Sequence, residues 1–172
     1  MPLESWPKFG DKPQQVWETW DNISSEMEMG DLLYGLIRML KPELTCETGC
    51  YMGYSTLRMA EAVCKNGFGK LISIDLDYTC AWNTRDRTKH IHPDFLEVRH
   101  GDVADKLPEI EQADFIFSDS SYEMRKVEMK RAKPGAVVVV HDTRLQKTLE
   151  GSVKEHGGLE FPAGRGFGIF IK

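Results

Sequence analysis

The sequence lacks any run of about 20 apolar residues, so no segment is long enough to cross a bilayer as a helix. Its first residues also lack the basic-then-apolar pattern of a secretory signal, and a cytoplasmic protein is therefore expected. There is no internal repeat and no low-complexity segment. With 41% hydrophobic and 28% charged residues, the composition is that of a globular domain in solution.

The sequence also lacks a paired cysteine motif and a positive net charge. The four cysteines show neither a close paired pattern nor a matching histidine cluster, which argues against a zinc site and predicts reduced thiols: Cys46, Cys50, Cys64 and Cys80. The formal net charge of −5 disfavours nucleic acid as a substrate, although Arg85, Arg87 and Lys89 form a local basic group. We therefore expect a small-molecule ligand.

The length of 172 residues suits one α/β domain better than two. Residues 1–24 combine Trp6, Trp17 and Trp20 with prolines and charges, which predicts an irregular arm or a short helix over the ligand cleft. Residues 25–172 are expected to form the core. Within it, the capping-box spacing of Ser25 and Glu28 predicts a helix that Pro42 ends.

Strand and helix patterns alternate along the core. Apolar runs predict strands at 44–47, 71–75, 95–99, 114–118 and 136–140, with a last strand around 167–171. Helical spacing predicts helices at 55–65, 78–89, 123–132 and 145–156. Several strands are apolar throughout, which is typical of a parallel sheet with helices on both faces.

A glycine-rich segment, Glu47–Ser55, lies between the first predicted strand and its helix. Gly49 allows a sharp turn, Gly53 allows close backbone approach, and the following helix offers free N–H groups to an anion. The carboxyl edge of an open α/β sheet is where such folds bind ligands. A simpler interpretation is that the glycines only turn the chain and that Glu47 caps a helix.

Two acidic residues indicate which ligand this edge binds. Asp75 ends the second strand, where its carboxylate would accept hydrogen bonds from both hydroxyls of a ribose, unless it is only a solvated strand end. Glu47 would suit an ammonium group. Tyr51 stands where the dinucleotide fingerprint has its middle glycine, which argues against a pyrophosphate. A ligand with an amino-acid end and a ribose end fits both acids.

At these positions the sequence resembles class I S-adenosylmethionine-dependent methyltransferases, particularly the metal-dependent O-methyltransferases typified by catechol O-methyltransferase. Their loop has the form E-x-G-x-Y-x-G-Y-S, which Glu47–Ser55 meets throughout. The resemblance continues at Asp75, at His100–Asp102, at 133–142 and at 165–169. It implies an α/β Rossmann-like fold, with helices on both faces of a mostly parallel seven-stranded sheet and an antiparallel last strand.

The resemblance implies S-adenosylmethionine as cofactor. The residues it assigns to the cofactor come from the loop and the strand ends: Glu47, Thr48, Gly49, Tyr51, Gly53, Ser55, Asp75, Leu76, Asp102, Val103 and Asp119. Asp102 follows a glycine, so a plain Asx turn is the alternative to a contact with adenine.

The resemblance also implies a divalent cation such as Mg²⁺ on Asp119, Asp142 and Thr143, where the related enzymes have two aspartates and an asparagine. The lysine base of the catechol enzymes has no counterpart beside Tyr122. His141 is the leading candidate for a general base, with Asp119 and Asp142 completing the catalytic set. The alternatives are that His141 only orients a loop and that the aspartates hold no metal.

Three functions remain open from the sequence. The first is O-methylation of a small-molecule or sugar hydroxyl, and the second is a non-catalytic module that binds the cofactor without turnover. The third is an α/β enzyme that uses another nucleotide. The stretch between Asp119 and Lys133 is short, so it would leave the acceptor site partly open. The site would have to be closed by the N-terminal arm, by a second subunit of a homo-oligomer or by a large acceptor itself.

Overall fold

The protein is described from a computed structural model that covers residues 8–9, 17–21, 23–145, 149 and 151–172. Trp6 and part of the helix expected at 145–156 lie outside the described residues. Within the described ranges, no helix is long and apolar enough to cross a membrane. All four cysteines are free, in agreement with the expected thiols.

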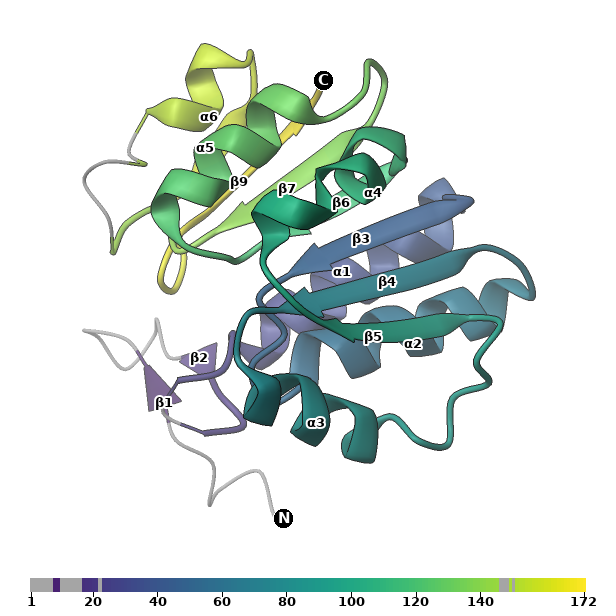
Figure 1. The fold of residues 1–172 in the computed structure, drawn as a ribbon. Coiled ribbons are helices and arrows are strands. Elements are labelled where there is room, and N and C mark those ends of the chain that lie inside the picture. The colour runs from purple at the N-terminus through teal and green to yellow at the C-terminus, as the bar shows by residue number, and fades with distance from the viewer. Residues whose placement is uncertain (1–7, 10–16, 22, 146–148, 150) are drawn as a thin grey trace.

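A seven-stranded sheet forms the centre of the molecule, in the order β5-β4-β3-β6-β7-β9-β8 (Figure 1). Five strands run parallel, β9 is antiparallel to β7, and β8 is antiparallel to β9. The strands are β3 (Leu44–Thr48), β4 (Lys70–Asp75), β5 (Leu96–His100), β6 (Phe115–Ser118), β7 (Val137–His141), β8 (Leu159–Phe161) and β9 (Phe167–Ile171). This confirms the predicted Rossmann-like architecture and its antiparallel last strand.

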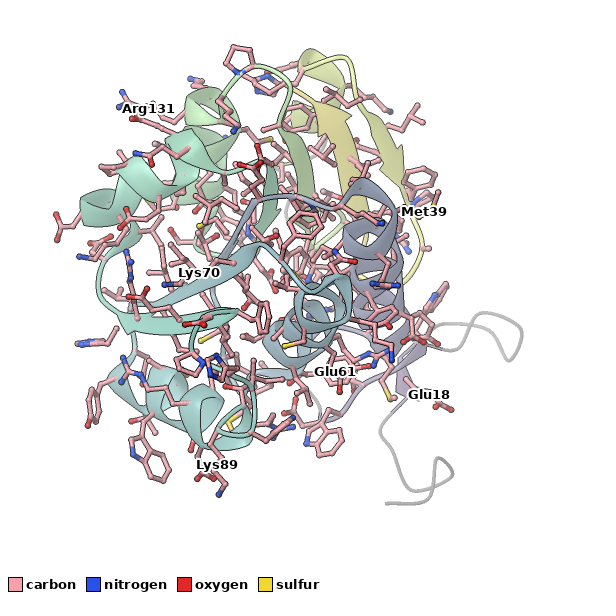
Figure 2. All side chains as sticks on the ribbon, turned by 90° about the vertical axis from the view of Figure 1, so that its right-hand side faces the viewer. Glu18, Met39, Glu61, Lys70, Lys89 and Arg131 are labelled. Atoms are coloured by element: carbon pink, nitrogen blue, oxygen red, sulfur yellow. The ribbon has the colours of Figure 1, made fainter. Side chains whose placement is uncertain are left out.

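Helices cover both faces of the sheet, because alternate side chains of each strand enter different cores. Phe117 and Val139 pack under α1 and α2, whereas Ile116 and Val138 pack under the helices of the other face. The helices are α1 (Met27–Leu40), α2 (Tyr54–Asn66), α3 (Tyr78–Arg87), η2 (Val103–Lys106), α4 (Leu107–Gln112), α5 (Tyr122–Arg131) and α6 (Ser152–Glu155). Charged residues such as Lys89 and Arg131 lie on the outside (Figure 2).

Several local predictions were wrong. The Ser25–Glu28 capping box does not form, because α1 begins at Met27 and Glu28 instead accepts a hydrogen bond from the Glu18 N–H at 3.3 Å. The helical segments at 103–112 and strand β8 were not predicted, since both are too short to show a period. In the described part of 145–156, only the single turn of α6 is helical.

The described part of the N-terminal arm contains two very short strands, β1 (Lys8–Phe9) and β2 (Trp17–Glu18), which pair antiparallel. This is the irregular arm of the prediction, with strands in place of a short helix. Beyond β2, the Trp20 ring stacks on Tyr54, with centroids 6.4 Å apart, and the Arg87 guanidinium lies 4.7 Å from the Trp20 ring centre. These contacts fasten the end of the arm to α2 and α3.

Candidate active site

The loop from β3 to α2 turns where the sequence predicts, and two glycines make the turn possible. Gly49 has φ +82°, and a Cβ there would collide with the backbone carbonyl of Asp119. Gly53 has φ +79° and packs against Thr84 of α3. The Cα of Gly53 therefore lies close to the neighbouring helix α3.

Asp75 holds this loop in place from the end of β4. Its Oδ2 accepts hydrogen bonds from the N–H groups of Cys50 and Tyr51, both at 2.9 Å, and its Oδ1 accepts one from the Asp77 N–H at 2.9 Å. A carboxylate offers about four acceptor positions. One is left for a ligand, so the predicted grip on both hydroxyls of a ribose would require Asp75 to release an amide.

A cavity of about 300 Å³ lies on the β4–β5 side of the loop. Its polar rim includes Asp75 and Asp102, and its apolar walls include Val103, Met124 and the largely exposed Leu76. Asp102 also accepts a hydrogen bond from the Ala104 N–H at 2.9 Å, so it makes the Asx-type cap of η2. The structure thus brings five predicted cofactor residues together: Gly49, Asp75, Leu76, Asp102 and Val103.

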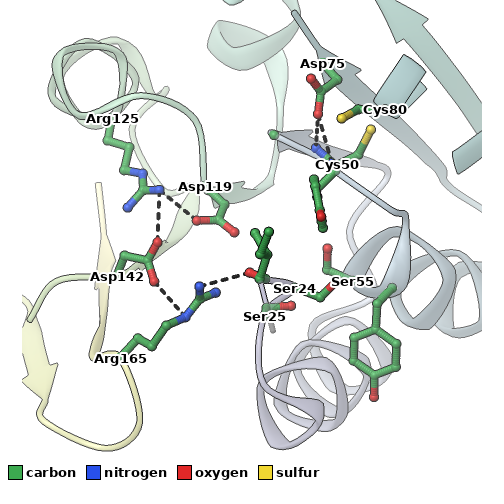
Figure 3. A pocket seen from close by; sticks show the side chains of 14 residues that line it. Ser24, Ser25, Cys50, Ser55, Asp75, Cys80, Asp119, Arg125, Asp142 and Arg165 are labelled. Atoms are coloured by element: carbon green, nitrogen blue, oxygen red, sulfur yellow. Dashed lines mark hydrogen bonds and ion pairs between the residues drawn. The ribbon is translucent and has the colours of Figure 1, made fainter. Parts of the chain in front are cut away.

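A second cavity of about 280 Å³ adjoins the first and shares Gly49 and Asp75 with it (Figure 3). The predicted residues on its walls are Gly49, Tyr51, Ser55, Asp75, Asp119 and Asp142. Ile23, Ser24 and Ser25 close one side, so the segment after the arm borders this cavity. The cleft therefore continues from β4 to the ends of β6 and β7.

Glu47 does not face either cavity. It is fully buried, and its carboxylate accepts hydrogen bonds from the hydroxyls of Ser55, Thr56 and Ser73 at 2.5, 2.5 and 2.6 Å. Burial raises the pKa of Glu47 to about 7, against the opposing effect of these hydrogen bonds. The expected contact with an ammonium group is therefore not supported by the position of Glu47.

Thr48, the next residue, points to the other face of β3 and is also buried. Its hydroxyl donates to Glu128 Oε2 at 3.0 Å, and Ser118 and Ser120 donate to the same carboxylate. Burial raises the pKa of Glu128 above its ordinary value. Thr48 therefore stabilises the end of β3 through Glu128, and it lines none of the cavities described above.

His141, the candidate base, lies at the end of β7 and is fully buried. Its Nε2 is 2.7 Å from Glu26 Oε2, and its Nδ1 is 3.3 Å from Asp119 Oδ1 and 3.4 Å from Asp142 Oδ1. Burial opposes protonation, but these carboxylates outweigh it and raise the pKa of His141 to about 10. The imidazole is protonated at neutral pH, which does not suit a general base.

Asp119, His141 and Asp142 place one ligand atom each within 4.8 Å of one another, which is the spacing of a metal site. Two arginines already face the carboxylates (Figure 3). Arg125 Nη2 is 2.8 Å from Asp119 Oδ1 and 3.5 Å from Asp142 Oδ2, and Arg165 Nε is 3.1 Å from Asp142 Oδ1. The guanidinium groups therefore face the carboxylate oxygens that a divalent ion would use, by a hydrogen bond at Asp119 and by ion-pair contacts alone at Asp142, whose Oδ1 has no hydrogen-bond partner among the described residues.

The third predicted metal ligand, Thr143, does not belong to this cluster. Thr143 is buried and lines a different cavity, together with Arg144 and Phe161. Its N–H donates to the Gly166 carbonyl at 3.1 Å, which fixes Thr143 against the loop before β9. The residues present therefore do not fit a divalent metal site.

Sequence reasoning missed three charged groups of this site, namely Glu26, Arg125 and Arg165. Arg125 is one of several basic residues in α5, and nothing in the sequence distinguishes it from the exposed Arg131. Arg165 was noted only as part of a strand motif. Glu26 lies inside the capping box predicted for Ser25 and Glu28, and nothing in the sequence marks it as a site residue.

Comparisons with known proteins agree with this fold. The family model for a methyltransferase domain matches residues 46–143, which is more than half of the chain. No curated protein matches the sequence significantly.

Three solved structures illustrate the likeness in fold. TomG, an O-methyltransferase from Streptomyces achromogenes solved with SAM, is 21% identical with a TM-score of 0.70, over 87% of this chain and 82% of TomG. An O-methyltransferase from Bacillus cereus in complex with SAH is 19% identical with a TM-score of 0.69, covering 88% and 84%. PaMTH1 from Podospora anserina, bound to SAH, is 17% identical with a TM-score of 0.70, covering 98% and 91%. The match to the family model shows that the chain belongs to the methyltransferase domain family.

Proposed function

We propose that this protein transfers a methyl group from S-adenosylmethionine to a hydroxyl oxygen of a small molecule or glycan. The observation that carries the proposal is the pair of adjoining cavities that share Gly49 and Asp75. The cavity beside Leu76 and Val103 has apolar walls and an acidic rim, which suit a nucleoside. The cavity beside Asp119 and Asp142 has carboxylates, hydroxyls and a helix N-terminus, which suit the amino-acid end of the cofactor.

Each end of the cofactor has suitable partners along this cleft. Leu76, Val103 and Met124 offer apolar surface to the base, and the free acceptor position of Asp75 suits one ribose hydroxyl. The first N–H groups of α2 suit the carboxylate of the methionine moiety. We assign the ammonium group to Asp119 instead of the buried Glu47, because Asp119 lines the cavity and Arg125 pairs with its Oδ1, which leaves Oδ2 for the ligand.

Methyl transfer from a sulfonium is an in-line displacement, so the protein has to align the acceptor oxygen with the methyl carbon and remove one proton. His141 is buried and already protonated. Asp119 and Asp142 line the cavity and are the remaining members of the predicted catalytic set. We assign proton acceptance to Asp142, whose pKa burial raises above its ordinary value.

Calorimetric titration with S-adenosylhomocysteine tests the cofactor assignment. Asp75→Ala removes the ribose acceptor and three hydrogen bonds to backbone amides, so affinity should fall by about a hundredfold or more. Asp94→Ala, on the exposed loop before β5, is the matched control and should bind like the wild type. Unchanged affinity in Asp75→Ala would contradict the proposal.

Catalysis needs a separate test, because a non-catalytic module would also bind the cofactor. Transfer of a labelled methyl group from S-adenosylmethionine to a panel of phenols, sugars and other alcohols is the expected result. Asp142→Asn should lower the rate while cofactor affinity changes little. Tight binding with no transfer to any acceptor would favour the non-catalytic module, and co-purification of another nucleotide would favour the third function.

A further inference from the structure

We infer that Arg125 is the resident cation of the Asp119–Asp142 pair and that this methyltransferase site works without a divalent metal. The inference deepens the proposed function and rests on it for the reaction that the site carries out. The placement of charges itself is independent of which cofactor binds.

Every carboxylate oxygen of the pair lies near a nitrogen of a basic side chain. Both oxygens of Asp119 are 3.3 Å from His141 Nδ1, and Asp119 Oδ1 is also 2.8 Å from Arg125 Nη2. For Asp142, Oδ1 is 3.1 Å from Arg165 Nε and Oδ2 is 3.5 Å from Arg125 Nη2. A divalent ion would have to displace a guanidinium to gain a ligand from each aspartate.

Arg125 is fixed so firmly that displacement is unfavourable. It comes from α5, its side chain is 5% exposed, and its Nε donates to the Ser120 carbonyl at 2.7 Å. Its Nη1 donates to the His141 carbonyl at 2.6 Å. Moving Arg125 aside would break both bonds, one of them to the carbonyl of the fully buried His141, which is costly.

The charges also balance without a metal. Three basic side chains, Arg125, His141 and Arg165, face three acidic ones, Glu26, Asp119 and Asp142. Arg165 is held by a bond from its Nη1 to the Ile23 carbonyl at 3.0 Å. A divalent ion added to this group would lie close to two guanidinium groups and be repelled by both. No metal ion is then available to chelate two neighbouring oxygens of the acceptor. The acceptor therefore needs no pair of adjacent hydroxyls.

Titration with Mn²⁺, followed by electron paramagnetic resonance of the free ion, tests the inference on the whole chain. The wild type should leave the free-ion signal unchanged, and its affinity for S-adenosylhomocysteine should be the same in EDTA and in Mg²⁺. Binding of one Mn²⁺ per chain that Asp119→Asn abolishes would overturn the inference, whatever the cofactor result.

Arg125→Gln tests the role of the arginine itself. Removal of this cation should tighten Mn²⁺ binding about tenfold or more, because the carboxylates lose a neutralising partner. Arg131→Gln, on the outside of the same helix, is the matched control and should bind no Mn²⁺ (Figure 2). A folded Arg125→Gln variant that binds Mn²⁺ no better than wild type would contradict the assignment. If circular dichroism shows that it does not fold, Arg165→Gln is titrated instead with the same two outcomes.

Discussion

Glu26 Oε2 lies 2.7 Å from His141 Nε2 and so joins the start of α1 to the end of β7, 115 residues apart in the chain. The other oxygen of Glu26 accepts a hydrogen bond from the Arg165 N–H at 2.6 Å. Burial opposes ionisation, but the bond from His141 outweighs it and lowers the pKa of Glu26 to about 2. His141 is thus a structural cation that organises three carboxylates around the cleft.

This arrangement predicts a large loss of stability in His141→Gln. The variant removes the cation nearest to Glu26 and one of the two that face Asp119, in a largely buried site, which should cost about 3–5 kcal/mol in the free energy of unfolding. Urea denaturation at pH 7 measures the loss. His92→Gln is the control, since His92 pairs with Asp94 at the surface and should change stability by less than about 0.5 kcal/mol. Equal stability of the two variants would contradict the structural role.

The sequence predicts the fold around the β3–α2 loop and the end of β4, because its signals are local. The turn glycines, Asp75 at a strand end and the apolar strands all lie in short segments whose geometry follows from their residue types. The orientation of Glu47 could not be predicted in this way. Whether its carboxylate enters the cleft or meets Ser73 depends on how α2 packs on β4, which is a tertiary contact.

The charged centre was harder to predict for the same reason. Arg125 lies in a helix with too few apolar residues to define a buried face, and only the folded sheet edge shows that it points inward. The position of Thr143 depends on the loop that carries Gly166. The expected metal ligands were carried over by resemblance, which could not show the arginines opposite them.

Glu47 predicts a specific pH dependence of stability. Its pKa is about 7 in the folded chain and 4.5 as an ordinary value, so the folded state holds this proton more tightly. The free energy of unfolding should therefore fall, by roughly 3 kcal/mol, as pH rises from about 4.5 to 7. Glu47→Gln should lack this part of the pH dependence, because its amide has no such proton. Urea denaturation across this range compares the two proteins, with the exposed Glu123→Gln as control; parallel curves for wild type and Glu47→Gln would contradict the prediction.

Alanine substitutions at Gly49 and Gly135 separate the cost of backbone strain from the cost of a steric collision. Gly49→Ala must adopt φ +82° and also place a Cβ against the Asp119 carbonyl. Gly135→Ala meets the same kind of strain at φ +86° with open space around it, so it should lose only about 1–2 kcal/mol. Gly49→Ala should lose clearly more in thermal or urea unfolding and should also weaken S-adenosylhomocysteine binding. A similar loss of stability in both variants would contradict the prediction, because it would show that the backbone at Asp119 moves to accommodate the added Cβ.

Leu76 tests the proposed base-binding wall without disturbing the core. Its side chain is 67% exposed in the free protein yet lines the cavity beside Asp75, so most of its apolar surface is available to a bound adenine. Leu76→Ala should weaken S-adenosylhomocysteine by about 1 kcal/mol, or roughly fivefold, because less apolar surface is buried on binding. Its free energy of unfolding should hardly change, since little of this side chain is buried in the fold. Leu159→Ala, equally exposed at 64% on the far edge strand β8, should leave affinity unaltered. If both variants bind S-adenosylhomocysteine like the wild type, the adenine lies elsewhere and the assignment of this cavity to the nucleoside is wrong.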